Sequence, residues 1–392
     1  MHLALSFLFL IFISKASLAN ENTVFQGYAR AGVGLANDGG KQACFKLPGA
    51  KAKYRLGNEC EHFAEFAVEQ KIDIESTLDL RYTGMLTFLS QGSSGGEDYA
   101  SSLEGNYFSV GNVLNNQPQA RLWIGKRYYR RQDIHINDFF YWNTSGPGGG
   151  IENYQLGSFS MSYALLPSSD TDGNTSLTHD LRLTKLKSNN TGELTIGLAL
   201  GQASNREEST VSDTGGWALN VLHKQALLSG ENSLSLQYGE GGLADPGARN
   251  NPLASSADVG YRLSNSLVIN TLGSWSSMWV LIYEDMEVNQ LSTTWFSAGA
   301  RPQYHLNQHA SLALEFGVDQ VKQGSSDSSH LYKVTLAAQL SPKAEFWSRP
   351  VFRGFVTYGA WNEQAEGAGI DTDSVFKGKS GLTFGVQSEA WW

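Results

Sequence analysis

The sequence predicts an all-β protein, a closed antiparallel barrel that crosses a membrane with strands. Three observations lead to this prediction: an N-terminal export signal, a repeated alternation of apolar and polar residues, and a last segment that ends on an aromatic residue. Beyond the export signal, no stretch has the roughly 18 consecutive apolar residues that a transmembrane helix requires. An inner-membrane helical protein is therefore excluded.

Residues 1–19 have the features of a secretory signal peptide. The apolar run 3–13 is too short to span a bilayer, and the small residues that end at Ala19 suit a cleavage site. Only His2 precedes the apolar run, which is unusual for a signal, so a short membrane anchor remains the alternative. We expect residues 1–19 to be removed and residues 20–392 to form the barrel.

The charge of the chain argues against one class of partner. Lys and Arg total 29 against 38 Asp and Glu, which gives a net charge of -9 at pH 7. Loss of Lys15 with the signal makes the mature chain -10 (-9 minus 1). Nucleic-acid binding depends on a basic surface, so we expect no nucleic-acid partner.

From Phe25 onward, segments of about ten residues alternate apolar with polar or small residues, and clusters of Gly, Asn, Ser and Asp separate them. The segment 194–200 is an example, with Leu or Ile at every even-numbered position. A soluble β-sandwich shows the same alternation, so the period alone predicts strands and not a membrane. No linker or shift of composition divides residues 20–392, and we expect one domain.

The last segment, 382–392, separates the barrel from the sandwich. Its even-numbered positions form a largely apolar face, and it ends on Trp392. An aromatic residue at this place suits the interfacial girdle of an outer-membrane barrel. We expect this strand to pair with the first strand and close the barrel, with Trp391 pointing into the lumen.

The chain has two cysteines, Cys44 and Cys60. Exported proteins enter an oxidising compartment, so the pair is predicted to form one disulfide that closes a small loop. The alternative is a metal site that includes His62, but metal sites normally need three or four ligands at recognisable spacing, and the neighbouring sequence supplies no others. We expect no metal and no cofactor.

Several strings in the chain carry a resemblance to a known family. They are Gly27-Tyr28-Ala29-Arg30, Lys53-Tyr54-Arg55-Leu56-Gly57-Asn58-Glu59-Cys60-Glu61, Gly125-Lys126-Arg127-Tyr128-Tyr129, Asp138-Phe139-Phe140-Tyr141-Trp142, Ser145-Gly146-Pro147-Gly148, Trp347-Ser348-Arg349-Pro350 and Trp391-Trp392. In these strings the chain resembles the maltoporin family of trimeric sugar-specific porins. The similarity covers the whole mature chain and is strongest before residue 160 and after residue 345.

The resemblance implies an 18-stranded antiparallel transmembrane barrel with inward-folded constriction loops. It implies a homotrimer in the outer membrane of a Gram-negative bacterium, in contact with membrane lipid. It also implies a lumen lined by a spiral of aromatic side chains flanked by ionisable groups, along which oligosaccharides such as maltodextrins diffuse passively. Such a channel is not an enzyme.

The alternation of residues predicts which side chains face that lumen, since neighbours with apolar or small side chains suit lipid. The side chains predicted to point inward are Tyr28, Arg30, Phe63, Glu65, Glu69, Trp347, Arg349, Arg353 and Trp391. In the segment 346–358, the side chains predicted to point outward are Phe346, Phe352, Val356 and Tyr358.

The resemblance gives these residues roles. The sugar slide consists of Tyr28, Phe63, Trp347 and Trp391, with Tyr99 placed where the family has an aromatic residue that reaches the neighbouring subunit. The polar track and constriction consist of Arg30, Arg55, Glu65, Arg131, Asp133, Asp138 and Phe140, of which the last four belong to a constriction loop within 131–150.

A pyranose has an apolar ring face that stacks on an aromatic side chain and a rim of hydroxyls that needs donors and acceptors. Contacts in a channel must also be weak and repeated, because a tight site stops conduction. The pairing of aromatic and charged residues suits both needs. Two alternatives remain open: an aromatic residue can belong to the interfacial girdle, and the loop charges can serve only to pin the loop to the wall.

Two positions depart from the family pattern and leave the preferred sugar undetermined. Phe140 stands where the family has a constriction tyrosine, which keeps the ring and removes a hydroxyl. Glu231 aligns with a phenylalanine of the slide. A sucrose or β-glucoside porin of the same fold is therefore the main alternative, followed by a less selective carbohydrate porin.

Other functions find less support in the sequence. An enzyme would need a catalytic set, and the chain has no Gly-x-Ser-x-Gly or His-Glu-x-x-His motif. The string Gly378-Lys379-Ser380 has Asp373 where a phosphate-binding loop needs its first glycine. A role of surface loops as a receptor leaves no mark in the sequence and is compatible with transport.

Overall fold

The computed structural model describes residues 22–91, 98–204, 214–367, 376 and 378–392. The signal peptide predicted over residues 1–19 lies outside this set. Within the described ranges, no helix has both the length and the apolar character needed to cross a membrane.

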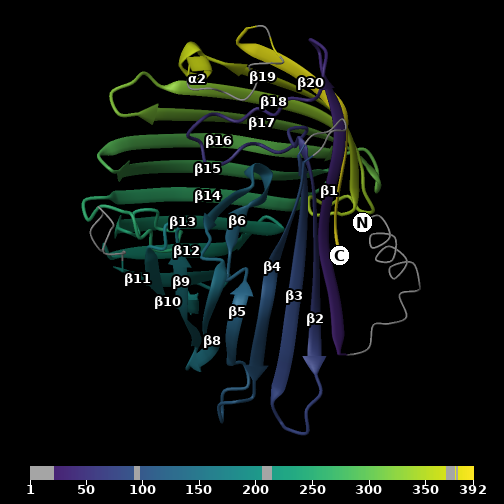
Figure 1. Ribbon diagram of the computed structural model, residues 1–392. Coiled ribbons are helices and arrows are strands. Elements are labelled where there is room, and N and C mark those ends of the chain that lie inside the picture. The colour runs from purple at the N-terminus through teal and green to yellow at the C-terminus, as the bar shows by residue number, and fades with distance from the viewer. Residues whose placement is uncertain (1–21, 92–97, 205–213, 368–375, 377) are drawn as a thin grey trace.

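Eighteen strands of the described residues form one closed antiparallel sheet (Figure 1). They are β1 (Thr23–Ala36), β2 (Glu61–Ile72), β3 (Asp79–Gln91), β4 (Asp98–Gly111), β5 (Arg121–Arg127), β8 (Gly146–Leu156), β9 (Phe159–Ser169), β10 (Thr175–Lys187), β11 (Gly192–Ser204), β12 (Gly216–Leu227), β13 (Gly230–Gly241), β14 (Val259–Leu272), β15 (Trp275–Val288), β16 (Leu291–His305), β17 (Ala310–Gln323), β18 (Ser329–Leu340), β19 (Val351–Trp361) and β20 (Ser380–Trp391). A short helix, α2 (Glu363–Gly367), follows β19.

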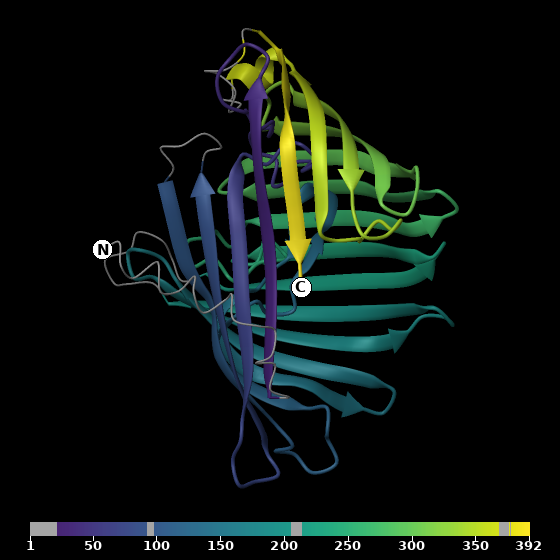
Figure 2. The same ribbon diagram turned by 90° about the vertical axis from the view of Figure 1, so that its right-hand side faces the viewer.

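The first and last strands close the ring. Figure 2 shows β1 and β20 side by side and running in opposite directions. Their register extends from Tyr28 opposite Trp391 to Ala36 opposite Thr383. The predicted 18-stranded barrel and its closure by the last segment are therefore confirmed.

The two ends of the barrel differ in the length of their connections. One end carries the long connections 37–60, 128–145 and 242–258, whereas the other carries tight turns such as 157–158 and 228–229. Outer-membrane barrels have short turns on the periplasmic side and longer loops outside. The end with the tight turns, where β1 begins and β20 ends, is therefore the periplasmic end.

Side chains along the strands alternate between lumen and membrane. On β1, Phe25, Val33 and Leu35 are 50%, 51% and 51% exposed on the outer face. Large apolar side chains are also exposed on β2, β14 to β20 and other strands. Because lipid covers this face in the membrane, the exposure is what a transmembrane wall requires. Phe352, Val356 and Tyr358 are exposed, as predicted.

Phe346 was predicted to point outward, and this prediction is wrong. The side chain is only 2% exposed and belongs to the interior core. The reason is that β19 begins at Val351, so Phe346 and Trp347 lie in the connection 341–350, where the alternation of a strand does not apply. Phe346 packs edge-on against Trp347, with 5.0 Å between the ring centroids.

Long connections fold into the barrel and fill part of it. Phe45 and Tyr54 of the connection 37–60 are buried with Phe139 of the connection 128–145 in one core cluster. Tyr54 lies against two wall glycines, Gly299 and Gly317, where a Cβ would stand 2.4 Å and 2.1 Å from its ring. Glycine at these positions leaves room for the ring and lets the loop dock on the wall.

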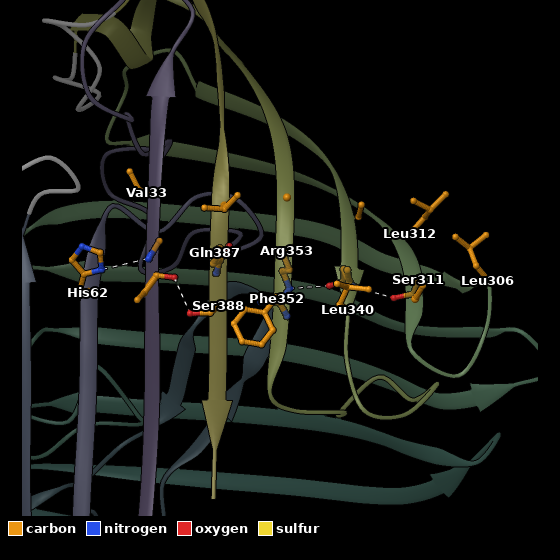
Figure 3. Close-up of a pocket in the computed structure, with 17 residues that line it drawn as sticks. Val33, His62, Leu306, Ser311, Leu312, Leu340, Phe352, Arg353, Gln387 and Ser388 are labelled. Atoms are coloured by element: carbon orange, nitrogen blue, oxygen red, sulfur yellow. Dashed lines mark hydrogen bonds between the residues drawn. The ribbon is translucent and has the colours of Figure 1, made fainter. Parts of the chain in front are cut away.

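A groove of about 770 Å³ lies on the outer wall, across β1 and β17 to β20 (Figure 3). Val33, Leu340 and Phe352, which are among its lining residues, are all more than half exposed on the membrane side. The groove thus belongs to the outer surface of the barrel and not to the lumen, where the candidate functional residues lie.

Candidate functional site

Four of the predicted slide residues form a continuous run of rings inside the barrel. The ring centroids of Phe63 and Tyr28 are 5.9 Å apart, and those of Tyr28 and Trp391 are 6.5 Å apart with an interplanar angle of 17°. The run continues from Trp391 to Trp347 over 6.3 Å. These separations lie within the usual range of about 4.5–7 Å for interacting aromatic side chains.

The strand register explains how residues from distant parts of the sequence meet. Tyr28 of β1 stands directly opposite Trp391 of β20, and Arg30 stands opposite Phe63 of β2. Because paired residues point to the same face of a sheet, all of these side chains enter the lumen together. Trp347 joins the run from the connection 341–350 at the periplasmic end.

A buried carboxylate, Glu389, connects the rings to the wall. It accepts a hydrogen bond of 3.0 Å from the Tyr28 hydroxyl and lies 2.8 Å from the guanidinium of Arg349 and 3.2 Å from that of Arg353. The Arg349 guanidinium also lies over the Trp391 ring at 4.3 Å. Glu389 therefore fixes the positions of Tyr28 and Trp391 through hydrogen bonds and through Arg349.

The predicted polar residues Arg30 and Arg55 lie beside the run. Arg55 is buried; it donates to the Tyr28 hydroxyl at 2.5 Å and to Glu59 at 2.6 Å. Arg30 pairs with Glu61 at 2.6 Å and lies 5.4 Å from the centroid of Phe63. Arg55 thus supports Tyr28 from the loop side, whereas Arg30 flanks Phe63.

The connection 128–145 contains most of the segment 131–150 that was predicted as a constriction loop, whereas residues 146–150 of that segment belong to the wall strand β8. It contains β6 (Gln132–Ile134), the 3-10 turn η1 (His135–Asn137) and β7 (Phe139–Trp142). The Arg131 guanidinium lies 3.5 Å from the Tyr128 centroid and 4.5 Å from the Phe140 centroid. These contacts tie Arg131 to two aromatic rings on the surface of the loop.

The loop contacts the β1–β2 side of the wall through polar groups. Tyr128 donates a hydrogen bond of 3.2 Å to Glu65, and burial raises the pKa of Tyr128 to about 12. Asp138 lies 3.6 Å from Arg30. Burial also raises the pKa of the Asp133 carboxyl above its ordinary value. The structure therefore brings Glu65, Arg30 and the predicted loop residues to one region of the lumen.

Sequence reasoning missed His135. Its ring lies 5.2 Å from Trp347 and 5.8 Å from Trp391, and Nε2 is 3.4 Å from Glu389. Burial lowers the pKa of His135 to about 4. The only signal in the sequence was its place within the constriction loop, two residues after Asp133.

A cavity of about 380 Å³ separates the constriction loop from the wall formed by β12 to β15. Arg131 and Asp133 line it from the loop, Trp347 lines it from the periplasmic end, and Lys224 and Glu231 line it from β12 and β13. Its volume lies within the range of about 300–1,000 Å³ that is usual for small-molecule sites. Glu231 is thus a lumenal residue.

Tyr99 lies apart from this region. It is 79% exposed, and through the register of β3 and β4 it shares a face with Phe88, which points to the membrane. Its place on the outer face does not bring it to the slide of its own barrel.

The two cysteines form a disulfide. Cys44 and Cys60 are bonded, with 5.9 Å between their Cα atoms, and they join the two ends of the segment that enters the barrel. Both thiols are therefore engaged. Within the described ranges, no group of three or more His, Cys, Asp or Glu residues is arranged to hold a metal ion.

Taken together, the lumen offers a strip of aromatic faces next to fixed charged groups. The strip can stack against the apolar face of a sugar ring, while Arg30, Arg131, Asp133 and Asp138 offer donors and acceptors to hydroxyls.

Comparison with solved structures supports the barrel. The crystal structure of a BenF-like porin from Pseudomonas fluorescens Pf-5 has a TM-score of 0.52 at 10% identity, over 95% of this chain and 99% of that chain. OccAB1 from Acinetobacter baumannii has a TM-score of 0.50 at 10% identity, over 95% of this chain and 96% of that chain. At such identities the likeness concerns the fold alone.

A family model described as LamB porin matches residues 23–392, which include every strand of the barrel. Members of this family are outer-membrane channels and not enzymes. The chain, a closed barrel with an apolar outer wall, therefore belongs to the LamB porin family and is a porin of the outer membrane.

Proposed function

We propose that this porin is a sugar-selective channel through which maltose and maltodextrins diffuse passively into the periplasm. The observation that carries the proposal is the unbroken run of Phe63, Tyr28, Trp391 and Trp347, whose successive centroids are 5.9, 6.5 and 6.3 Å apart. A sugar can pass from ring to ring along such a run without ever leaving an aromatic surface.

The charged groups give the second half of the proposal. Hydroxyls that leave water need new hydrogen-bond partners, and Arg30, Arg131, Asp133 and Asp138 lie along the same path. Because each contact is weak, a sugar binds and moves on, as conduction requires. Tyr99 would serve a neighbouring subunit, since it lies on the outer face of its own barrel.

The direct test measures block of ion current through the purified channel in planar bilayers. Maltose to maltohexaose should reduce the current in a saturable manner. Sucrose and a β-glucoside are tested in the same way, because a porin for these sugars is the main alternative. If these sugars block and no maltodextrin does, the maltodextrin assignment is wrong and a sugar porin of different preference remains.

The proposal includes export and assembly. Residues 1–19 would be removed as a signal peptide, residues 20–392 would form the barrel domain, and three copies would assemble in the membrane. N-terminal sequencing of the protein from outer membranes would test the first of these, and a mature chain that retains Met1 would contradict it.

A further inference from the structure

We propose that Lys224 and Glu231 form a polar exit site at the periplasmic end of the lumen, which binds the hydroxyl rim of a sugar ring as the ring leaves Trp347. This inference rests on the sugar-channel function proposed above and names two polar groups at the place where the family resemblance puts a slide phenylalanine, at position 231. Lys224 is not among the residues that the family resemblance singles out.

The two side chains share the lumenal face next to the tight turn 228–229. Lys224 stands opposite Ser233, and Glu231 stands two residues before Ser233 on the same strand, so all three point to one side of the sheet. Leu236, with the opposite parity, is 49% exposed on the outer wall. The pair therefore projects into the lumen close to the periplasmic rim.

Both residues line two cavities at once. One is the cavity between the constriction loop and the wall, which Trp347 and Asp133 also line. The other lies at the rim between the strands β10 to β13 and includes Asn189 and Glu193. The pair therefore lies where the cavity that Trp347 lines meets the cavity at the rim.

The pair has hydrogen-bonding capacity left over. Lys224 Nζ lies 3.4 Å from Glu231 Oε1, and Ser233 donates a hydrogen bond of 3.0 Å to the same oxygen. Among the described residues, no hydrogen bond or ion pair engages Glu231 Oε2, and Lys224 Nζ has no second hydrogen bond or ion pair. An ammonium has three donors and a carboxylate two acceptor oxygens, so both ends can bind hydroxyls.

Exposure separates this pair from the structural ion pairs of the barrel. The side chains of Lys224 and Glu231 are 43% and 49% exposed, whereas Arg301 and Glu315 in the wall are 2% and 0% exposed. An exposed pair at this distance adds little to stability. A role in holding the turn therefore does not account for it.

The charges around the cavity point to a neutral, polyhydroxylated ligand. Two positively charged side chains, Arg131 and Lys224, line the cavity together with two negatively charged ones, Asp133 and Glu231. The cavity therefore favours neither an anion nor a cation. Two neighbouring hydroxyls of one ring can meet such a pair together, one as donor to Glu231 and one as acceptor from Lys224. The ring face remains available to Trp347.

The test compares current block in planar bilayers for the native trimer, Lys224→Met, Glu231→Gln and the double variant. Block by maltohexaose should weaken roughly tenfold in each single variant, because a charge-assisted hydrogen bond is lost. The double variant should be little weaker than either single one, since both groups bind the same ring. Block by maltose should change less, because a short sugar can rest on the upper rings.

Two controls separate binding from structure. Lys224→Arg keeps a charged donor and should keep block near the native value, whereas Lys224→Met should not. Lys322→Met removes an exposed lysine at the opposite end of the barrel and should leave block unchanged. The heat stability and the sugar-free conductance of all variants should match those of the native channel.

The outcomes distinguish the two proposals. If maltodextrins block the native channel and the Lys224 and Glu231 variants bind maltohexaose as the native channel does, the exit site is wrong and the sugar channel stands. Losses that add fully in the double variant would also overturn joint binding. If no sugar blocks the native channel, the proposed function is wrong and the exit site with it.

Discussion

Tyr28 shows how one residue can serve both the fold and the pore. Its ring lies between those of Phe63 and Trp391, and its hydroxyl lies between Arg55 and Glu389. The hydroxyl donates to the carboxylate and accepts from the guanidinium. The ring is therefore held at a fixed angle in the lumen by two buried charged groups.

Substitutions of Tyr28 should separate these roles. Tyr28→Ala should weaken block by maltohexaose up to about tenfold, the magnitude of one lost aromatic stacking contact. Tyr28→Phe should keep block near the native value but lower the free energy of unfolding by about 1–3 kcal/mol, because buried Arg55 and Glu389 lose a partner. Current block and urea unfolding in detergent are the measurements.

Tyr332→Phe is the matched control for the second variant, since Tyr332 is 55% exposed on the outer wall. It should change neither quantity. Unaltered maltohexaose block in a folded Tyr28→Ala channel would contradict the role of this ring in the slide.

Phe140→Tyr should strengthen sugar block. The Phe140 ring lies 4.5 Å from the Arg131 guanidinium at the constriction, and a hydroxyl there would offer one further hydrogen bond to a passing sugar. Such a bond contributes about 0.5–1.5 kcal/mol net, or up to about tenfold in affinity. Titration of current block measures the change, with Phe352→Tyr on the outer wall as the control. A sugar affinity equal to the native one would show that passing sugars do not reach this position.

At the scale of elements, the strand faces could be predicted and the loops could not. Alternation placed Tyr28, Phe63 and Trp391 correctly, because a strand has only two faces and lipid demands apolar residues on one of them. It failed for Phe346, which lies outside any strand. No local pattern predicts where the side chains of an irregular segment lie in the folded barrel, because the path of the segment depends on contacts with distant wall residues.

The inward loops show this dependence on distant residues. The Tyr54 ring packs against Gly299 and Gly317. Its hydroxyl forms a hydrogen bond with Ser297, which is 243 residues further along the chain. His135 contacts Trp391 and Glu389 in the same long-range manner. A resemblance supplied the roles of the loop residues, but contacts of this kind emerged only from the folded chain.

His135 should make the docking of the constriction loop sensitive to pH. Its pKa is about 4 in the folded chain and 6.5 in an unfolded one, because burial disfavours the charged form. The unfolded state therefore binds more protons between these values, and stability falls as pH drops from 6.5 towards 4. Below pH 4 this residue causes no further loss.

The expected loss from this residue is about 3 kcal/mol at most, from the linkage between pKa and stability. Unfolding of the native protein and of His135→Gln between pH 7 and 4 measures it, and the variant should show the weaker pH dependence. His309→Gln, a change in the exposed turn between β16 and β17, should behave as the native protein does. If the free energy of unfolding falls equally with pH in the native protein and in His135→Gln, His135 does not cause the pH dependence.

The disulfide should stabilise the first inward loop without being required for the barrel. It spans 16 residues in the sequence, which corresponds to about 3 kcal/mol in the chain-entropy model. The loop has other anchors near Cys60, because Lys333 and Thr335 donate to the Leu56 carbonyl and Glu315 accepts from its amide. Cys44→Ser with Cys60→Ser should therefore still give a folded barrel of lower stability. Thiol labelling of denatured, unreduced native protein checks the bond, and two reactive thiols would refute it.

At the scale of the whole molecule, we expect a trimer. Three copies around one axis bury the same surface on each subunit, which is the usual form of closed homo-oligomers. Unheated detergent gels should show a large species that becomes a single chain on boiling. A channel that conducts as a monomer and never forms this species would contradict the expectation.

The pairing of β1 with β20 has a consequence for biogenesis. Tyr28 and Glu389, which share a hydrogen bond, are separated by 361 residues. Joining such remote segments has an entropic cost that only the completed ring repays, so this step comes late and slowly in folding. Before this step the sheet is open between β1 and β20, with Phe63 and Tyr28 near one free edge and Trp391 and Trp347 near the other, so the run of rings is interrupted between Tyr28 and Trp391. Maltodextrin binding should therefore appear abruptly when the barrel closes. A maltodextrin with a label that fluoresces on stacking would report when β1 pairs with β20 during folding.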